Sequence, residues 1–326
     1  MNKKRVLVAG AGGFIGHHLV KYLQKKGYWV RGVDIKKPEF ENTSADEFLL
    51  LDLRVKLNAE TATKGINHAY NLAANMGGVG FIETVHAEIM HDNVLIDTNM
   101  LEASRGNKVE RFFYSSSACI YPTFKQVTQK NAGLKEEDAY PADPDNSYGW
   151  EKLFTERICS DYYRDYGFET RVARFHNVYG SLGTWQGGRE KSPAALCRKV
   201  ALAKNVDTIE VWGDGEQTRS YCYIEDCLDG IYRLTMSDIR QPINIGSSRL
   251  VSINGLIDII SKIANKKIDK KYDTSKPQGV RGRNSDNTLI KKLLDWEPST
   301  SLEKGLKLTY AWISTQVQAE KYKVGS

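Results

Sequence analysis

The chain has 326 residues, of which 41% are hydrophobic and 26% charged, and its formal net charge is +6. This composition is typical of a globular protein, and no apolar run approaches the roughly 18 residues of a membrane-spanning helix. Lysines and arginines form no block interleaved with aromatic residues, so the charge does not indicate nucleic-acid binding, although it suits an anionic substrate. The length suggests two domains or one large α/β domain.

The N-terminal segment MNKKRVLVAGAGGFIG combines a basic start with apolar residues, as a secretory signal peptide does. Its apolar part is rich in glycine and lacks a small-residue cleavage pattern, so we interpret it as a first strand and expect a cytoplasmic protein without membrane association. The five cysteines form no C-x-x-C pair and leave one without a partner. This argues against a disulfide framework or a metal site and fits a reducing compartment.

Short apolar runs alternate with helix-like segments through the first half of the chain. The expected strands are RVLVAG (5–10), WVRGVD (29–34), EFLLLDL (47–53), HAYNLAA (68–74) and RFFYSSS (111–117). The expected helices include GHHLVKYLQKKG (16–27) and a longer segment around 85–106. Strands alternating with helices predict an α/β fold with a doubly wound parallel (Rossmann) sheet and right-handed crossovers.

Glycines 10, 13 and 16 lie between the first expected strand and helix, in the pattern G-x-x-G-x-x-G. Glycines there let the chain turn tightly and approach a pyrophosphate, which then lies at the helix N-terminus. Asp34 ends the second strand about 20 residues later, where a carboxylate binds a ribose 2′-hydroxyl and repels a 2′-phosphate. This predicts NAD as the cofactor, although Lys36 and Lys37 are residues of the kind that accommodate a 2′-phosphate.

Further residues lie where a dinucleotide bound at this turn would pass. Together with Asp34, the expected cofactor contacts are Gly10, Gly13, Phe14, Ile15, Gly16, Asp52, Leu72, Ala73 and Ala74. Small residues allow a strand end to run close to a cofactor, but core packing explains Ala73 and Ala74 equally well.

The segment SYGWEK places Tyr148 and Lys152 four positions apart, on one face of a helix. A tyrosine with a pKa of about 10 is a poor base, and a neighbouring ammonium group lowers that pKa. The pair can therefore take a proton from a sugar hydroxyl while a hydride leaves for the nicotinamide. The pattern alone is common by chance. Its place after a glycine-rich turn and after a strand that ends in Ser117 makes it specific.

From about residue 176 onward the pattern is irregular and rich in loops, which often carry substrate contacts. We expect residues 1–176 to form the NAD-binding domain. Residues 177–326 are expected to form mainly a smaller substrate-binding domain, with some segments returning to the first.

These motifs together resemble the extended short-chain dehydrogenase/reductases over nearly the whole chain. The segment WGDGEQTRSYCYIEDC (212–227) resembles their substrate-side signature, which implies that Arg219 contacts nucleotide phosphates. Longer blocks are similar to those of the GDP-mannose 3,5-epimerase family: NLAANMGGVGFI (71–82), SSSACIYP (115–122), RFHNVYG (174–180), GTWQGGREKSPAALCRK (183–199) and GVRGRNSDN (279–287).

The resemblance implies a tightly held NAD, GDP-mannose as substrate, inversion at C3 and C5 through a transient 4-keto sugar, and a homodimer. The products would be GDP-L-galactose, GDP-L-gulose or both. Motif by motif, Cys119 and Lys191 are the acid/base pair, Tyr148 and Lys152 serve the redox step, and Ser117 helps to hold the sugar. The other implied substrate contacts are Met76, Gly77, Asn177, Glu190, Lys199, Gln217, Arg219 and Arg281.

The chemistry explains a thiol after a buried strand. A C–H beside a ketone at C4 is acidic enough for a side chain to remove, and a thiol is an adequate base when a cation stabilises its thiolate. Lys191 is the candidate cation and proton donor. The alternatives are a buried filler for Cys119 and a surface lysine for Lys191. For His176 the alternatives are a catalytic role and a structural role as a hydrogen-bonded residue. For the arginines of GVRGRNSD they are binding of a diphosphate and a position in a solvated loop.

Three other functions remain open at this point. A 4-epimerase and a 4,6-dehydratase share the scaffold, but the dehydratases carry carboxylates where this chain has Ala118 and Cys119, and simple 4-epimerisation needs no Cys119 with Lys191. A non-catalytic dinucleotide sensor would have no need for Tyr148 and Lys152.

Overall fold

The main feature of the computed structural model, which describes residues 3–324, is one seven-stranded sheet with the order β11-β6-β5-β4-β1-β2-β3. Every neighbouring pair in it is parallel. The strands are β1 (Arg5–Ala9), β2 (Trp29–Asp34), β3 (Glu47–Leu50), β4 (His68–Asn71), β5 (Arg111–Ser117), β6 (Thr170–Phe175) and β11 (Ile243–Ile245). The expected doubly wound parallel sheet is confirmed.

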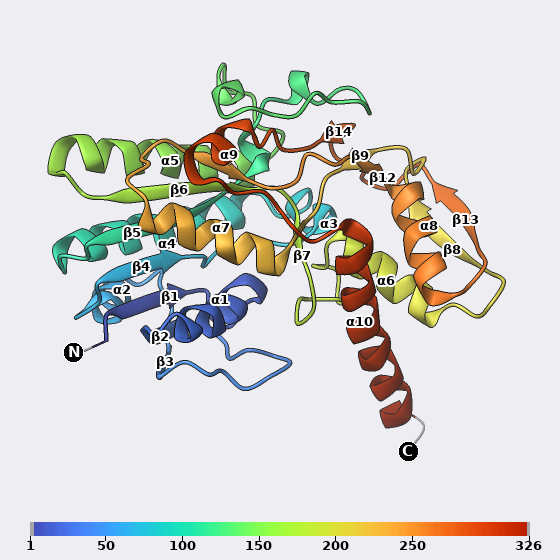
Figure 1. Ribbon diagram of the computed structural model, residues 1–326, viewed down its shortest axis with the longest axis horizontal. Helices are drawn as coiled ribbons and strands as arrows, with labels where there is room; N and C mark the ends of the chain where they lie inside the picture. Colours follow the sequence, from blue (N-terminus) through green and yellow to red (C-terminus); the bar gives the residue numbers. More distant parts are fainter. Residues whose placement is uncertain (1–2, 325–326) are drawn as a thin grey trace.

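Helices cover both faces of this sheet (Figure 1). One face carries α1 (Phe14–Lys25) and α7 (Ile224–Met236), and the other carries α2 (Lys56–Thr63), α4 (Ala87–Gly106) and α5 (Ser147–Tyr166). Successive side chains of a strand point to opposite faces. In β1, Val6 and Val8 therefore pack with the first set of helices and Leu7 with the second, which explains the continuous apolar run.

Two expected strands are shorter than predicted. The segment expected at 47–53 ends at Leu50, because Asp52 turns the chain by accepting a hydrogen bond from the backbone N–H of Arg54 at 3.0 Å. The segment expected at 68–74 ends at Asn71, which leaves Leu72 and the two alanines that follow in a loop. Both differences extend the loops at the carboxyl edge of the sheet.

Residues 177–326 contribute strand β11 to the main sheet and helix α7 to one of its faces. They also form small sheets beyond the main sheet (Figure 1). The small sheets are β12-β9-β14, β13-β8 and β10-β7. Their strands are β7 (Val178–Tyr179), β8 (Asp207–Trp212), β9 (Thr218–Arg219), β10 (Cys222–Tyr223), β12 (Val251–Ser252), β13 (Ile268–Asp273) and β14 (Gly282–Arg283). The other helices are α3 (Val79–Ile82), α6 (Ser192–Leu202), α8 (Ile253–Ala264), α9 (Thr288–Leu294) and α10 (Leu302–Val324).

Single 3-10 turns occur at η1 (Ala118–Ile120), η2 (Thr123–Lys125) and η3 (Glu136–Ala139). None of the helices within residues 3–324 has the length and apolar character needed to cross a membrane.

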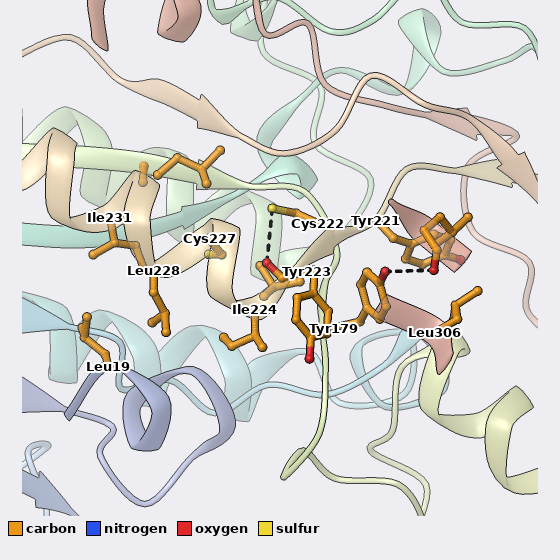
Figure 2. Packing of buried hydrophobic residues seen from close by; sticks show 14 of the residues in the cluster. Leu19, Tyr179, Tyr221, Cys222, Tyr223, Ile224, Cys227, Leu228, Ile231 and Leu306 are labelled. Carbon is orange, nitrogen blue, oxygen red and sulfur yellow. Dashed lines mark hydrogen bonds between the residues drawn. The ribbon is translucent and has the colours of Figure 1, made fainter. Parts of the chain in front are cut away.

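An apolar core joins α7 to α1 and α10 (Figure 2). The buried residues of α7 follow the i, i+3, i+4, i+7 spacing of one helix face: Ile224, Cys227, Leu228 and Ile231. They share the core with Leu19 of α1 and Leu306 of α10. All five cysteines are free, and four of them are buried in the manner of small apolar residues.

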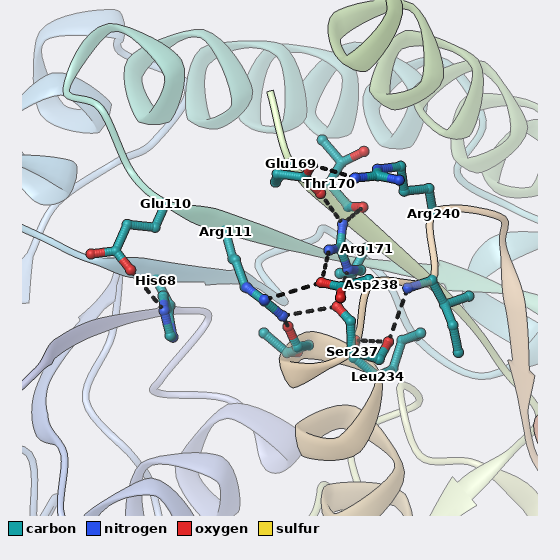
Figure 3. A network of polar contacts seen from close by, with 12 residues as sticks. His68, Glu110, Arg111, Glu169, Thr170, Arg171, Leu234, Ser237, Asp238 and Arg240 are labelled. Carbon is teal, nitrogen blue, oxygen red and sulfur yellow. Dashed lines mark hydrogen bonds and ion pairs between the residues drawn. The ribbon is translucent and has the colours of Figure 1, made fainter. Parts of the chain in front are cut away.

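Two arginines fix the end of α7 to the main sheet (Figure 3). Arg111 of β5 donates from Nη1 to the carbonyl oxygens of Thr235 and Ser237, each at 2.8 Å. Arg171 of β6 donates from Nε to the same Ser237 oxygen at 2.8 Å. The last carbonyls of a helix lack internal partners and favour cations. These bonds hold the starting ends of β5 and β6, whose opposite ends carry the candidate site.

Candidate active site

A cavity of about 590 Å³ lies along the carboxyl ends of β1, β2, β4 and β5, the usual place for ligands in an open α/β sheet. It extends from the glycine turn to the end of β5. The residues predicted from the sequence that line it are Gly10, Gly13, Phe14, Ile15, Gly16, Asp34, Asp52, Leu72, Ala73, Ala74, Met76, Gly77, Ser117, Tyr148 and Lys191.

The glycine turn is built to let a ligand approach the backbone. Gly10 has φ of +82°, and a Cβ there would lie 2.8 Å from the backbone nitrogen of Ala73. No side chain caps the N-terminus of α1, and its first turn holds no acidic residue. The first N–H groups of α1 are thus free to bind an anion such as a pyrophosphate.

Asp34 is held at the edge of the cavity by two backbone donors. Oδ2 accepts from Gly12 N at 2.9 Å and Oδ1 accepts from Lys36 N at 3.2 Å. Burial raises the pKa of Asp34, and these bonds oppose the rise. The carboxylate keeps acceptor capacity for a ribose hydroxyl. Asp52, by contrast, pairs with Arg54 at 2.7 Å, which lowers the pKa of Asp52. The residues at this end fit NAD.

The N-terminal end of α5 packs directly on the turn that carries Cys119. Asn146 caps the helix, with Oδ1 accepting from Gly149 N at 2.9 Å. A Cβ at Gly149 would lie 2.2 Å from the carbonyl oxygen of Cys119. Glycine in SYGWEK therefore permits the close approach that brings Tyr148 and Cys119 to one site.

Lys152 is fully enclosed beneath Tyr148. Its Nζ lies 5.5 Å from the centroid of the Tyr148 ring, and its side chain is 1% exposed. Burial lowers the pKa of Lys152, but the groups around it, Asp97 first among them, raise it above its ordinary value, so the ammonium form is stable. Lys152 opposes the effect of burial, but burial prevails, so the pKa of Tyr148 lies above its ordinary value and not below it as the sequence predicts.

Cys119 contacts an arginine rather than a lysine. Nη1 of Arg283 lies 3.2 Å from the Cys119 sulfur, and Nη2 lies 3.1 Å from Asp145. Burial would lower the pKa of Arg283, but Cys119 and Asp145 outweigh it and raise it. Ser117 accepts the Cys119 N–H at 3.2 Å and fixes the turn. The cation in direct contact with the thiol is therefore Arg283, which the sequence analysis did not pair with Cys119.

Lys191 precedes α6 and lines the same cavity. Within residues 3–324 its ammonium group has no hydrogen bond or ion pair. Burial lowers the pKa of Lys191, and the nearby Cys119 opposes this shift. A lysine with a lowered pKa gives up its proton more readily than an exposed one, which suits a proton donor.

Some predicted substrate contacts are engaged outside the cavity lining. Arg281 forms a two-pronged ion pair with Asp214 at 2.9 Å for both bonds. Lys199 donates to the Glu210 carbonyl at 2.7 Å. Glu190 accepts from Gly188 N at 2.7 Å and from Arg198 Nη2 at 3.0 Å. These side chains bond to other groups of the protein and do not line the cavity.

Other predicted contacts face inward near Arg283. Burial lowers the pKa of Arg219 to about 10, and the positive charge of neighbouring Arg283 adds to this shift. Oε1 of Gln217 is buried without a hydrogen-bond partner among the described residues. Asn177 has φ of +40° and donates from Nδ2 to the Ser220 carbonyl at 3.0 Å. Two close guanidinium groups and an unpaired acceptor suit an anionic, hydrogen-bonding ligand.

His176 has the structural role that the sequence analysis weighed against a catalytic one. Its side chain is fully buried, and Nε2 lies 3.1 Å from Asn244 Oδ1. Burial lowers the pKa of His176 to about 3, so the ring stays neutral.

The sequence analysis missed Asp97 and Glu151, which flank Lys152, and it did not connect Arg283 with Cys119. Glu151 directly precedes Lys152 in SYGWEK, and Asp97 interrupts the apolar run NVLIDTNML. A charged residue on a buried helix face is the signal that could have identified both carboxylates.

Comparison with known proteins agrees with this geometry. Residues 6–246 match the NAD dependent epimerase/dehydratase family. The chain is 50% identical to a GDP-mannose 3,5-epimerase of Arabidopsis thaliana and 51% identical to GDP-mannose 3,5-epimerase 1 of Oryza sativa subsp. japonica. Both matches cover 98% of this chain and 84% of the relative.

A solved structure supports the same fold. The UDP-glucose 4-epimerase of Thermotoga maritima, with UDP-glucose, matches with a TM-score of 0.87 and 27% identity, over 96% of this chain and 99% of the other. The chain belongs to the NAD dependent epimerase/dehydratase family and, within it, to the family of the GDP-mannose 3,5-epimerases.

Proposed function

We propose that the protein inverts GDP-mannose at C3 and C5 through a transient 4-keto sugar, with NAD as its cofactor, and releases GDP-L-galactose, GDP-L-gulose or both. The observation that carries this proposal is a thiol paired with a guanidinium, on a turn that packs against the helix bearing the Tyr-Lys pair. NAD, which the glycine turn and Asp34 would hold, would supply a reversible hydride acceptor for C4.

Tyr148 takes the proton of the C4 hydroxyl in the oxidation and gives it back in the reduction. Lys152 stabilises the phenolate form because its ammonium group is fixed beneath the ring. We assign to Ser117 a hydrogen bond to the sugar, and its position in the cavity lining together with Tyr148 supports this role.

Cys119 and Lys191 move the protons at carbon. Once C4 is a ketone, the C–H bonds at C3 and C5 are weakened through the enolate. Cys119 acts as the base, and the Arg283 guanidinium, 3.2 Å from its sulfur, is the cation in contact with it. Lys191, which lines the cavity and whose pKa is lowered by burial, supplies the proton. Inversion needs a base and an acid on opposite ring faces, which explains why both are present.

The diphosphate and guanine of the substrate extend towards the second half of the chain. Arg219 and Arg283 provide positive charge for the diphosphate. We also propose substrate contacts for Met76, Gly77, Asn177, Glu190, Lys199, Gln217 and Arg281. In this arrangement residues 1–176 mainly bind NAD and residues 177–326 mainly bind the GDP-sugar.

The protein is proposed to act as a cytoplasmic homodimer. Its five free cysteines fit a reducing compartment. Large apolar side chains are exposed on α4 and α5: Met90 at 38%, Trp150 at 44% and Phe154 at 47%. Such a patch on adjacent helices suits pairing with a second copy of the chain.

The deciding experiment is incubation with GDP-mannose in deuterium oxide, followed by NMR of the product. Deuterium at C3 and C5 is the expected result. A product changed only at C4, or loss of water from C6, would instead assign a 4-epimerase or a 4,6-dehydratase.

A further inference from the structure

Two buried carboxylates face one ammonium group under the candidate site. Lys152 Nζ lies 3.5 Å from Asp97 Oδ2 and 3.6 Å from Glu151 Oε1. The side chains of both acids are 0% exposed. A single buried cation balances one buried anion, and a second ionised carboxylate there carries a large desolvation cost.

The hydrogen bonds of the two acids differ. Asp97 accepts from Asn71 Nδ2 and Tyr114 OH, each at 2.8 Å, and from Thr155 Oγ1 at 3.3 Å, so both its oxygens have donors. Oε1 of Glu151 accepts from Asn93 Nδ2 at 2.8 Å, while Oε2 is buried without a partner among residues 3–324. Full solvation by donors suits an ionised Asp97, whereas the poorly solvated Glu151 suits a neutral carboxyl group.

We propose that Asp97 and Glu151 are positioning residues for proton transfer at Tyr148, acting through Lys152: Asp97 is its permanent counter-ion, and Glu151 is a neutral carboxyl group that fixes the ammonium without cancelling its charge. The inference rests on the proposed function, because it concerns the oxidation at C4. An ionised Glu151 would add negative charge beside Tyr148 and disfavour its phenolate form.

The other titratable groups around this cluster come from three elements. Tyr114 of β5 lies with its ring centroid 4.8 Å from Lys152 Nζ. Cys119 of η1 faces Tyr148, and Cys159 of α5 faces Asp97. Burial raises the pKa of Glu151 to about 8, with Lys152 opposing and Asp97 reinforcing the shift. Glu151 therefore keeps its proton at neutral pH and loses it as the pH rises through about 8.

The first test uses no turnover. Protein labelled with carbon-13 at the glutamate carboxyl carbons, with its NAD bound, is titrated by NMR. Glu151→Gln removes one resonance and thereby assigns it. Glu102→Gln is the matched control on α4, where an exposed glutamate pairs with Arg105 at 2.6 Å. We expect the Glu151 resonance to titrate near pH 8, whereas the Glu102 resonance should titrate below the ordinary glutamate value because Arg105 lowers its pKa.

A second variant, Asp97→Asn, tests the charge state of Glu151 without changing position 151. With the neighbouring anion gone, Glu151 becomes the counter-ion of Lys152, so its resonance moves to a lower pH. A Glu151 resonance that titrates in wild type at the ordinary value of about 4.3 overturns the proposal. So does a resonance that stays in place in Asp97→Asn. Because these readouts need no substrate, they are independent of whether GDP-mannose is the substrate.

The second test follows the rate of C4 oxidation against pH. In wild type the rate declines above about pH 8, where Glu151 ionises, and in Glu151→Gln this decline is absent. Glu151→Ala lowers the rate at every pH, and Gln at this position restores most of it. The double variant Asp97→Asn/Glu151→Gln leaves Lys152 without a carboxylate, and its rate falls by roughly 10²-fold or more. Identical profiles for wild type and Glu151→Gln contradict the proposal.

Discussion

The guanidinium group of Arg283 lies 3.2 Å from the sulfur of Cys119, although 164 positions separate the two residues. Cys119 follows β5 at the carboxyl edge of the main sheet, whereas Arg283 belongs to β14, which pairs in parallel with β9. The contact joins the two halves of the chain at the proposed base. It also assigns different roles to the two arginines of GVRGRNSD, because Arg281 turns to Asp214 instead.

Arg283→Ala should slow deuterium incorporation at C3 and C5 by about 10- to 100-fold, the size expected for loss of a hydrogen bond to a charged group. NMR of GDP-mannose in deuterium oxide measures this rate at saturating substrate. Arg281→Ala is the matched comparison, since its exposed ion pair contributes less than about 1 kcal/mol to stability. Equal losses of exchange in the two variants would contradict the assignment. Weaker GDP binding by Arg281→Ala would support the substrate contact proposed for that residue.

Cys119→Ala should separate oxidation at C4 from proton transfer at carbon. Tyr148 and Lys152 remain intact, so the variant should reduce its bound cofactor in the presence of GDP-mannose but exchange no carbon-bound hydrogen. Absorbance of the reduced nicotinamide and NMR measure the two events. Tyr148→Phe should show neither event, with a loss of roughly 10²–10⁴-fold. A Cys119→Ala variant that epimerises at the wild-type rate would show that the thiol is only packing.

Loss of the Lys191 proton should make product formation decline at alkaline pH. Burial lowers the pKa of Lys191, so its ammonium form is lost at a lower pH than the value of about 10.4 for an exposed lysine. In wild type, the ratio of inverted product to exchange on the face of Cys119 should therefore fall as the pH rises. Lys191→Ala should show the same exchange without inversion across the pH range. Full inversion by Lys191→Ala would refute its role as proton donor.

Asp34 should make NAD the dinucleotide that purified protein releases on denaturation. The carboxylate faces the cavity and has room for ribose hydroxyls, whereas a 2′-phosphate would meet a negative charge. Chromatography of the released nucleotide checks this. Mainly NADP in the released fraction would show that Lys36 and Lys37 dominate the site.

Gly149→Ala should damage both stability and activity. The added Cβ would lie 2.2 Å from the Cys119 carbonyl oxygen, so α5 and η1 must separate. Overpacking of this kind costs about 1–3 kcal/mol of unfolding free energy. Gly106→Ala is the control at a helical glycine of α4, where an added Cβ meets nothing within 4 Å. It should stabilise the protein by about 0.5–1 kcal/mol. Thermal unfolding distinguishes the two variants, and equal melting temperatures would contradict the packing argument.

The sequence by itself determined the features that depend on short-range rules. The alternation of strands and helices, the glycine turn, and Asp34 at the end of β2 follow from local propensity and period. Tyr148 and Lys152 share a face because a helix brings positions four apart together. These rules need no knowledge of distant residues.

Only the tertiary structure decided which charges meet. Arg283 and Cys119 are brought together by the pairing of β14 with β9, and Asp97 reaches Lys152 because α4 packs against α5. Nothing local distinguishes Arg283 from Arg281, two positions away, since the direction of each side chain depends on the partner that the folded backbone brings within reach. Long-range packing therefore chose the cation beside the thiol and the counter-ion beneath the tyrosine.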